Sequence, residues 1–491
     1  MTHYIGGNWQ QGQGQEFQSH DPSSGGLLWT GKEAVTSQVD AAMAAAAKAF
    51  DSWALKPLEA RVEVIRRYAD LLAERKPQMA ELIACETGKP LWDATGEATA
   101  MANKVEISLT AYEERTGTRE AVNGAITSRL THRPHGVMAV FGPYNFPGHL
   151  PNGHIVPALI AGNTIVFKPS EITPAVAELM VKTWEEAGLP AGVLNLVQGG
   201  RGTGTALVAS KKINGLLFTG SAKTGQSIAR QLVERPHIIQ ALELGGNNPL
   251  IVHEVEDKKA AAVLTVLSAF VTSGQRCTCA RRLIVPEGEA GDQFVETLLH
   301  VMSCISVGAW DDVSQPFMGP VVSAAAANTV LEAQQRLLDG GAAALMSVTR
   351  LARGDAFLTP GLLDVTNVEN LPDEEVFGPL LQLTRVADFE AAIAEANNTE
   401  YGLASGLVSD SRALYESFYP RARAGIVNWN QQLTGAASTA PFGGIGLSGN
   451  HRPSAYYAAD YCSFAVASME NSEGKALVAS LPVGLNLEDK T

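Results

Sequence analysis

The sequence predicts an α/β protein built from two Rossmann-like, doubly wound domains. Short apolar stretches typical of strands alternate with helical stretches in two blocks, one starting at Asn163 and the other near Pro249. Such alternation is typical of βαβ units, in which parallel strands lie buried between layers of helices. Two blocks of this kind predict two open sheets with an active site between them.

Helices are predicted ahead of both blocks. Residues 37–53, "SQVDAAMAAAAKAFDSW", are rich in alanine and carry larger apolar residues near helical spacing, and residues 58–76 continue the pattern. From about Ala125 the pattern changes, and "AITSRLTHRPHGVMAVFG" predicts extended chain that runs into a Gly-Pro turn. A sheet is therefore expected to start here.

Each block predicts its own series of strands. The first block contains "NTIVFKPS", "GVLNLVQG", "GLLFTG" and "HIIQALELGG". The second contains "PLIVHE", a long helix ending at Gly274, "RRLIVPE", a helix near residues 293–303, "LLQLTRV", "GLASGLVS" and "AGIVNWN". Residues 456–468 predict one more strand beyond both blocks, and the polar end after it is expected to be a loose terminus.

Composition narrows the class of protein. The 491 residues are 45% hydrophobic and 18% charged, as in globular proteins, and the net charge of -14 argues against a nucleic-acid partner. No basic and apolar leader is visible, and stretches such as residues 261–271 are too short to span a membrane. A cytoplasmic location is expected. A disulfide framework is not, because the cysteines are few and odd in number: Cys85, Cys277, Cys279, Cys304 and Cys462.

Two glycine-rich loops imitate phosphate-binding motifs. "GGRGTG" (199–204) has the wrong spacing for the dinucleotide fingerprint, and "GSAKTGQS" (220–227) lacks the P-loop lysine because Gln226 stands in its place. Gly220 and Gly225 still bracket a strand-to-helix turn, and Ser221 can cap that helix. Its free N–H groups can face a pyrophosphate. A plain packing turn explains the loop equally well.

Lys168 and Glu171 follow the first predicted strand of the first block. Ligands bind at the carboxyl ends of strands in such sheets. Glu171 could accept hydrogen bonds from the adenosine ribose and would repel a 2′-phosphate, which favours NAD. The alternative is a solvated surface pair.

Three further residues follow predicted strand or helix ends: Asn145, Glu243 and Cys277. Singly, these could be a helix cap, a structural hydrogen-bonding group and a small buried hydrophobe. Together they predict an acyl-transfer site with a thiolate nucleophile, a carboxylate base and an amide donor for an oxyanion.

At this point the sequence resembles the aldehyde dehydrogenase family. The matching motifs, in family order, are "GPYNFP", "NTIVFKPSE", "FTGSAKTG", "LELGGNNP", "GQRC", "EEVFGPL", "GIVNWN" and "PFGGIGLSG". The resemblance implies that Cys277 is the nucleophile, Glu243 the general base and Asn145, with the Cys277 N–H, the oxyanion hole. It also implies a set of NAD-binding residues: Lys168, Glu171, Gly220, Ser221, Gly225, Glu375 and Phe377.

The resemblance also implies a domain division and an assembly. It implies a dinucleotide-binding domain at 1–120 and 137–246, a catalytic domain at 247–445, an oligomerisation arm at 121–136 and 446–470, and a tail at 471–491. A homodimer or homotetramer is expected. The implied reaction passes through a thiohemiacetal and a thioester on Cys277, and Glu243 activates the water that releases the acid.

Some segments are more particular than the family pattern, notably residues 132–164, "GQRCTCARR" and "SGNHRPSAYYAADYC". These resemble the branch of the family that oxidises N-succinylglutamate 5-semialdehyde to N-succinylglutamate in arginine catabolism. Cations expected near the site could pair with the substrate's carboxylates, or could be structural or surface groups: Arg276, His154, His451 and Arg452. Arg276 could instead lower the pKa of Cys277.

Other interpretations stay open at this point. Another small acidic semialdehyde, such as that of glutamate or succinate, could be the substrate, and some use of NADP is compatible with the sequence. A non-catalytic dinucleotide-binding or structural protein on this scaffold is a further alternative. No metal is expected, because H-E-x-x-H is missing and C-x-C is incomplete as a ligand set. Cys279 is expected to be a packing residue.

Overall fold

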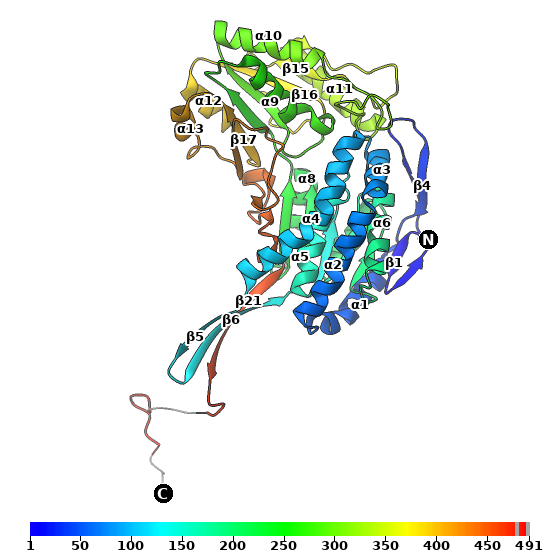
Figure 1. Cartoon of the computed structure of the whole chain (residues 1–491), viewed down its shortest axis with the longest axis vertical. Helices are drawn as coiled ribbons and strands as arrows, with labels where there is room; N and C mark the ends of the chain where they lie inside the picture. Colours follow the sequence, from blue (N-terminus) through cyan, green and yellow to red (C-terminus); the bar gives the residue numbers. More distant parts are fainter. Residues whose placement is uncertain (477–480, 488–491) are drawn as a thin grey trace.

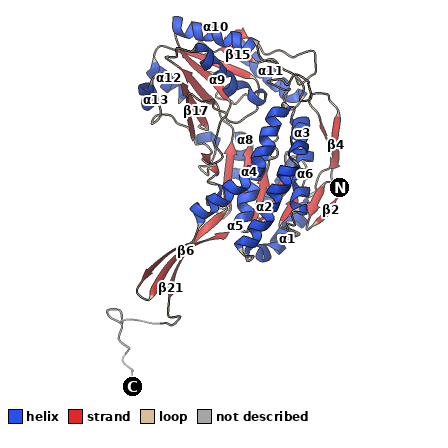
Figure 2. Ribbon diagram, viewed as in Figure 1, coloured by secondary structure: helices blue, strands red, loops and turns tan. Residues whose placement is uncertain are grey.

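The computed structural model of the chain describes residues 1–476 and 481–487. Two large sheets, each with its own helices, form the upper and lower parts of an elongated body, and a narrow arm projects from the lower part (Figures 1 and 2). This arrangement confirms the prediction of two mainly parallel sheets. The predicted tail residues 477–480 and 488–491 lie outside the described residues.

The first sheet has seven strands in the order β11-β10-β7-β8-β9-β1-β2, of which the first five are parallel. Its strands are β1 (His3–Ile5), β2 (Asn8–Gln10), β7 (Val137–Phe141), β8 (Thr164–Lys168), β9 (Leu194–Leu196), β10 (Gly215–Gly220) and β11 (Ile239–Leu244). β7 and β8 are buried at every position, which fits parallel strands covered on both faces.

Eight helices accompany the first sheet among the described residues. They are α1 (Thr36–Ala54), α2 (Leu58–Glu74), α3 (Lys76–Thr87), α4 (Leu91–Thr116), α5 (His149–Ala161), α6 (Pro174–Glu186), α7 (Arg201–Ala209) and α8 (Ala222–Leu232). α4 and α5 pack against each other, and Figure 1 shows α4 running up towards the second sheet. Helix α4 is thus placed to connect the two halves of the body.

The second sheet also has seven strands, in the order β14-β15-β16-β13-β12-β17-β18. They are β12 (Asn248–Val252), β13 (Ala280–Pro286), β14 (Ala343–Met346), β15 (Gly361–Asp364), β16 (Leu380–Val386), β17 (Ala404–Val408) and β18 (Ile426–Trp429). The helices of this half are α9 (Lys258–Phe270), α10 (Glu289–Ser303), α11 (Ala324–Asp339), α12 (Phe389–Ala396) and α13 (Arg412–Phe418).

The arm is a three-stranded antiparallel sheet in the order β21-β6-β5. Its strands are β5 (Arg119–Asn123), β6 (Ile126–Pro134) and β21 (Ser463–Asn471). β21 pairs with β6 over the full length of both. The two chain segments predicted to form the arm therefore lie side by side although they are far apart in sequence. Residues 446–462 run back along the first sheet before the arm strand begins, and Gly449 bridges to Glu243 there.

Several elements differ from the sequence prediction. The long helix expected to end at Gly274 ends at Phe270, and a 3₁₀ turn, η1 (Val271–Gly274), follows it. The strand expected at 456–468 starts with a short helix, α14 (Ala458–Tyr461), because this stretch packs into the first domain's core. Short antiparallel pairs without a clear apolar alternation were not predicted: β1–β2, β3 (Glu16–His20) with β4 (Leu27–Lys32), and β19 (Pro441–Phe442) with β20 (Ser454–Ala455).

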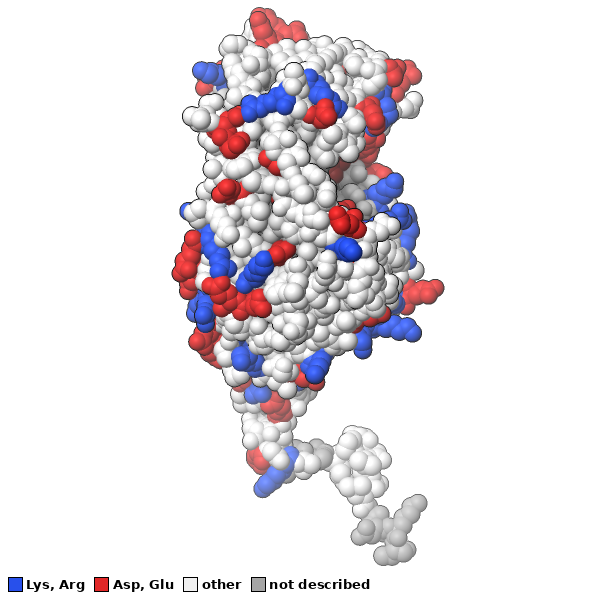
Figure 3. Space-filling view, turned by 90° about the vertical axis from the view of Figure 1, so that its right-hand side faces the viewer, with Lys and Arg blue, Asp and Glu red and all other residues white. Residues whose placement is uncertain are grey.

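The surface carries both signs of charge. On the face in Figure 3, acidic and basic side chains lie close to one another over the body. Such mixing differs from the basic stripe that a polyanion binder needs. Among the described helices, none combines the length and apolar character needed to cross a membrane.

Candidate active site

A cavity of about 900 Å³ lies at the carboxyl ends of β7, β8, β10 and β11. Asn145, Glu243 and Cys277 line it together with residues predicted to bind the cofactor: Lys168, Glu171, Gly220, Ser221, Glu375 and Phe377. The volume is typical of small-molecule sites. The structure thus brings the three residues of the predicted acyl-transfer site and most of the predicted cofactor residues into one cavity.

The loop that carries Cys277 lies between η1 and β13, and the turn η1 that leads into it has an unusual backbone. Thr272 and Ser273 both have a φ of 55°. Gly274 has a φ of 71°, and a Cβ on it would lie 2.1 Å from the carbonyl oxygen of Gly378. Left-handed conformations at non-glycine residues are costly and persist only where the surroundings impose them. The loop is therefore held by its neighbours.

Two side chains from other segments hold this loop through its carbonyls. Asn248 donates from Nδ2 to the carbonyl oxygens of Cys277 and Cys279, at 2.7 and 2.9 Å. Arg281 donates to the carbonyls of Gly274 and Arg276, at 2.6 and 2.9 Å. These bonds fix the position of the Cys277 thiol relative to the cavity.

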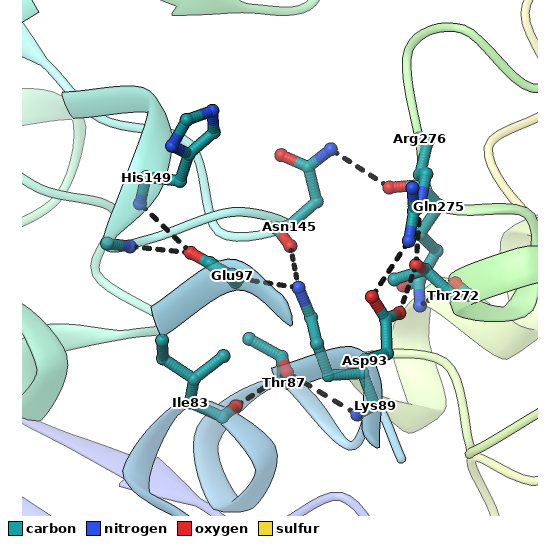
Figure 4. A network of polar contacts seen from close by, with 11 residues as sticks. Ile83, Thr87, Lys89, Asp93, Glu97, Asn145, His149, Thr272, Gln275 and Arg276 are labelled. Carbon is teal, nitrogen blue, oxygen red and sulfur yellow. Dashed lines mark hydrogen bonds and ion pairs between the residues drawn. The ribbon is translucent and has the colours of Figure 1, made fainter. Parts of the chain in front are cut away.

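Asn145 is tied to the same loop from the other side. Its Nδ2 donates to the Gln275 carbonyl at 2.9 Å, and its own carbonyl accepts from Lys89 Nζ at 2.7 Å (Figure 4). A side-chain amide has two N–H groups, so one remains for a ligand. The geometry leaves Asn145 oriented and able to donate into the cavity.

Glu243 lies near the end of β11 and is 5% exposed. Its Oε2 has no hydrogen-bond partner among the described residues. Burial raises the pKa of Glu243 well above its usual value, and the Ser454 backbone acts in the opposite direction. A carboxyl with this environment is a stronger base than an exposed glutamate.

Burial also raises the pKa of the Cys277 thiol, to about 12. The nearby carboxylates of Glu375 and Glu243 add to this effect, while Arg281 opposes it. In the protein without ligand, therefore, the thiol keeps its proton at neutral pH. Arg276, considered from sequence as a group that lowers this pKa, is paired with Asp93 at 2.8 Å.

One end of the cavity offers groups suited to the adenosine half of a dinucleotide. Lys168 is 7% exposed and lies 3.7 Å from the Glu171 carboxylate, whose side chain faces solvent. Ser221 caps α8 by accepting from the Thr224 N–H. Gly225 does not line the cavity itself, and a Cβ there would lie 2.5 Å from Leu244, so it permits close packing of α8 on β11.

Glu375 and Phe377 stand at the other end, next to Cys277. The Glu375 carboxylate occupies the space where Gly245 lacks a side chain, since a Cβ on Gly245 would lie 1.7 Å from Oε2. Glu375 Oε1 is buried without a hydrogen-bond partner among the described residues, 3.6 Å from Arg281 Nη2. Phe377 packs edge-on against Tyr144. An unpartnered buried carboxylate oxygen at this point suits a ligand hydroxyl.

The four cations predicted near the substrate lie in different environments, and none lines the cavity. Arg276 pairs with Asp93 at 2.8 Å and also donates to Thr272 Oγ1 (Figure 4). His154 is buried between the hydroxyls of Tyr461 and Thr219, and burial lowers its pKa to about 3, so it is neutral. His451 and Arg452 are exposed.

A polar network that the sequence reasoning missed supports the site from beneath (Figure 4). Lys89 and Glu97 form a fully buried ion pair at 2.7 Å, and Glu97 also accepts from the N–H groups of Gly148 and His149. Asp93 lies between them in sequence. The spacing of four residues from Asp93 to Glu97 was the available signal, because charged residues at helical intervals share one face, while Lys89 lies just before the helix.

The chain was compared with known proteins. The model of the aldehyde dehydrogenase family matches residues 9–465. The chain belongs to the aldehyde dehydrogenase family. Two relatives named N-succinylglutamate 5-semialdehyde dehydrogenase are similar to it: that of Ectopseudomonas mendocina (strain ymp) is 57% identical over 99% of this chain and 100% of the relative, and that of Pseudomonas fluorescens (strain Pf0-1) is 56% identical over 99% of each.

Several solved structures share the fold. PnpE in complex with nicotinamide adenine dinucleotide has a TM-score of 0.91 and 30% identity, covering 97% of this chain and 98% of that one. An NADP-dependent enzyme of E. coli has a TM-score of 0.90 and 30% identity, covering 96% and 98%. Both nicotinamide dinucleotides thus occur among proteins of this fold.

In this aldehyde dehydrogenase the two neighbouring cysteines have different surroundings. Cys277 is partly exposed and lines the cavity, whereas Cys279 is fully buried. The Cys279 sulfur lies 3.8 Å from the carbonyl oxygen of Val271. The described cysteines are all free thiols.

Proposed function

We propose that this aldehyde dehydrogenase oxidises N-succinylglutamate 5-semialdehyde to N-succinylglutamate with NAD, in arginine catabolism. The observation that carries the proposal is one cavity lined by Cys277, Glu243, Asn145 and groups suited to a dinucleotide. The names of relatives that match almost the whole chain support the substrate.

The residues present fit a nicotinamide dinucleotide. Lys168 and Glu171 would hold the adenosine ribose, and the capped turn of Gly220 and Ser221 would face the pyrophosphate. Glu375, with its unpartnered oxygen, would hold the second ribose beside Phe377. When bound, the dinucleotide supplies a hydride acceptor, and its positive ring favours the thiolate form of Cys277. The Glu171 carboxylate would repel a 2′-phosphate, which favours NAD over NADP.

The first stage of the proposed mechanism forms a bond between Cys277 Sγ and the aldehyde carbon. The thiol releases its proton to solvent, and the carbonyl oxygen becomes an oxyanion as the C–S bond forms. The free N–H of Asn145 Nδ2 and the Cys277 backbone N–H stabilise that charge. Bonds from Asn248 and Gln275 hold these donors in place before the substrate arrives.

The second stage releases the acid. Oxidation of the adduct leaves a thioester on Cys277, which keeps the acyl group bound. Glu243 takes a proton from a water molecule, and the resulting hydroxide attacks the thioester carbon. The C–S bond then breaks, and the product leaves as the carboxylate. The raised pKa of Glu243 suits it to accept this proton.

A coupled NADH absorbance assay tests the proposed substrate. We expect the highest kcat/KM with N-succinylglutamate 5-semialdehyde, lower values with the semialdehydes of glutamate and succinate, and lower rates with NADP than with NAD. A higher kcat/KM for either of the smaller semialdehydes would replace the proposed substrate with that one. No oxidation of any short aldehyde would favour a non-catalytic protein.

We also propose the domain division and assembly that the family resemblance implies. Residues 1–120 with 137–246 would bind the dinucleotide, 247–445 would carry the nucleophile, and 121–136 with 446–470 would form the arm between subunits. We propose that the protein is a homodimer or homotetramer in the cytoplasm. It would act on a small molecule and would bind no nucleic acid or membrane. The exposure of every residue of β5 supports an interface at the arm.

A further inference from the structure

Lys104 is a buried cation for which the described chain supplies no carboxylate. It lies on α4 and is 1% exposed. The other buried lysines and the buried arginines Arg281 and Arg282 each have a carboxylate within 4.0 Å, and Arg61 donates to three carbonyls instead. Lys104 Nζ donates only to the Ala455 carbonyl, at 2.7 Å, within the described residues.

This is an expensive arrangement without a further partner. An ammonium has three N–H donors, and a charge withdrawn from water is costly unless it is paired and hydrogen-bonded. Burial accordingly lowers the pKa of Lys104 to about 8. A buried, largely unpartnered cation of this kind marks a place where an anion can bind.

Lys104 does not line the active-site cavity itself, but it lies next to α5, which reaches that cavity. The Lys104 side chain packs next to Gly153 of α5, where a Cβ on Gly153 would lie 4.0 Å from Lys104 Cε. Leu150, three residues earlier and on the same face of α5, lines the active-site cavity. On the other side, the Ala455 carbonyl that accepts from Lys104 directly follows Ser454, whose backbone acts on the Glu243 carboxyl.

A second buried polar atom on α5 also lacks a partner. The Nδ1 of His149 has no hydrogen-bond partner among the described residues. The charges of Lys104 and Lys89 contribute to lowering the pKa of His149 to about 4, so the ring is neutral and stands near both lysines. His149 is four residues before Gly153, which places it on the same side of the helix.

We propose that Lys104 is a specificity-determining residue that binds a carboxylate of the substrate. This inference rests on the proposed function, because it assumes an acidic aldehyde at Cys277. The two carboxylates of N-succinylglutamate 5-semialdehyde lie along the molecule away from the aldehyde. One of them would meet the Lys104 ammonium while the aldehyde meets the thiol. Arg276, already paired with Asp93, is not needed for this role.

The test compares kcat/KM for the acidic semialdehyde and for pentanal, a neutral aldehyde, in the wild type, Lys104→Met and the exposed-lysine control Lys211→Met. Removing one partner of a buried hydrogen bond between charged groups weakens binding strongly. We therefore expect Lys104→Met to lower kcat/KM for the acidic substrate roughly 30-fold or more. We expect Lys104→Met to keep its activity on pentanal and Lys211→Met to resemble the wild type. Equal losses on both aldehydes, or no loss, would overturn the inference.

A second variant covers the case in which Lys104→Met does not fold. Lys104→Gln keeps a donor for the Ala455 carbonyl but loses the charge, and we expect the same selective loss. Inhibition by the product N-succinylglutamate should weaken in parallel, while the Kd of NAD stays unchanged. A wild type that oxidises pentanal but not the succinylated semialdehyde would refute the proposed function instead. In that case, the effect of Lys104→Met on kcat/KM would be measured with the semialdehydes of succinate and glutamate and compared with its effect on pentanal.

Discussion

At the scale of single residues, the site combines two acids that both hold their protons more tightly than usual. Burial is the largest cause of the raised pKa of both Cys277 and Glu243. The carboxylates of Glu375 and Glu243 raise the pKa of Cys277 further. The reaction requires both groups to lose a proton, one to attack and one to activate water. The protein without ligand is therefore poised but not reactive.

The first prediction at this scale concerns pH. Because the pKa of each group is raised, the reactive forms are scarce at low pH and increase as pH rises, so kcat/KM should climb with increasing pH. Glu243→Gln should release NADH once per active site and then turn over at least about 100-fold more slowly, because the thioester has no base to activate water. Stopped-flow absorbance measures both. Steady turnover by this variant at the wild-type rate would contradict the role of Glu243.

The second prediction separates the two cysteines. Cys277→Ala should lower dehydrogenase activity by at least about a thousandfold while NAD binding, followed by fluorescence titration, is unchanged. The matched control is Cys279→Ser, which changes a buried thiol that does not line the cavity. Loss of activity in reduced Cys279→Ser enzyme with intact folding would count against this division.

At the scale of elements, the sequence predicted the strands better than the support beneath the site. The buried apolar runs of β7, β8, β10 and β11 are continuous, so their pattern is visible along the chain. The polar face of α4 was missed, because Asp93, Glu97 and Lys104 satisfy partners on distant segments. The sequence also predicted helix at Thr272, because the apolar helix pattern continues there. In the structure Thr272 has a positive φ, which long-range contacts impose.

A third prediction tests that support. Asp93 accepts from Thr272 Oγ1 and from Arg276, and thus ties α4 to the turn before Cys277. Asp93→Asn keeps one acceptor but loses the charge, and should lower the free energy of unfolding by about 1–3 kcal/mol. We expect kcat to fall about tenfold or more, because the loop then positions the thiol less well.

The readouts for Asp93→Asn are urea unfolding, kcat, the KM for NAD and the pH dependence of Cys277 alkylation. The KM for NAD should stay close to that of the wild type, since Asp93 does not line the cavity. Asp70→Asn, which changes an exposed aspartate on α2, is the matched control. An unchanged kcat and an unchanged alkylation profile would show that the pair does not position the loop.

At the scale of the whole molecule, the arm is the part least able to stand alone. All residues of β5 are exposed, and both β5 and β21 are edge strands of a sheet with three strands. Small sheets need a second layer for stability, and open edges invite pairing with another chain. Figure 1 shows the arm projecting beyond the body, where the described chain offers no second layer.

The last prediction follows from this exposure. Val122 and Met469 on the arm are 72% and 78% exposed, which is unfavourable for apolar side chains in a monomer. If a second subunit covers them, Val122→Asp with Met469→Asp should reduce the mass measured by light scattering towards the 51.9 kDa of one chain. Val313→Asp, which changes an exposed valine on the body, should leave the mass unchanged. A wild type that already has the mass of one chain, or a double variant that keeps the wild-type assembly, would remove the arm from the proposed interface. Residues 446–462 connect the bridge between Gly449 and Glu243 to the arm strand β21. A dissociated variant should therefore also show a lower kcat.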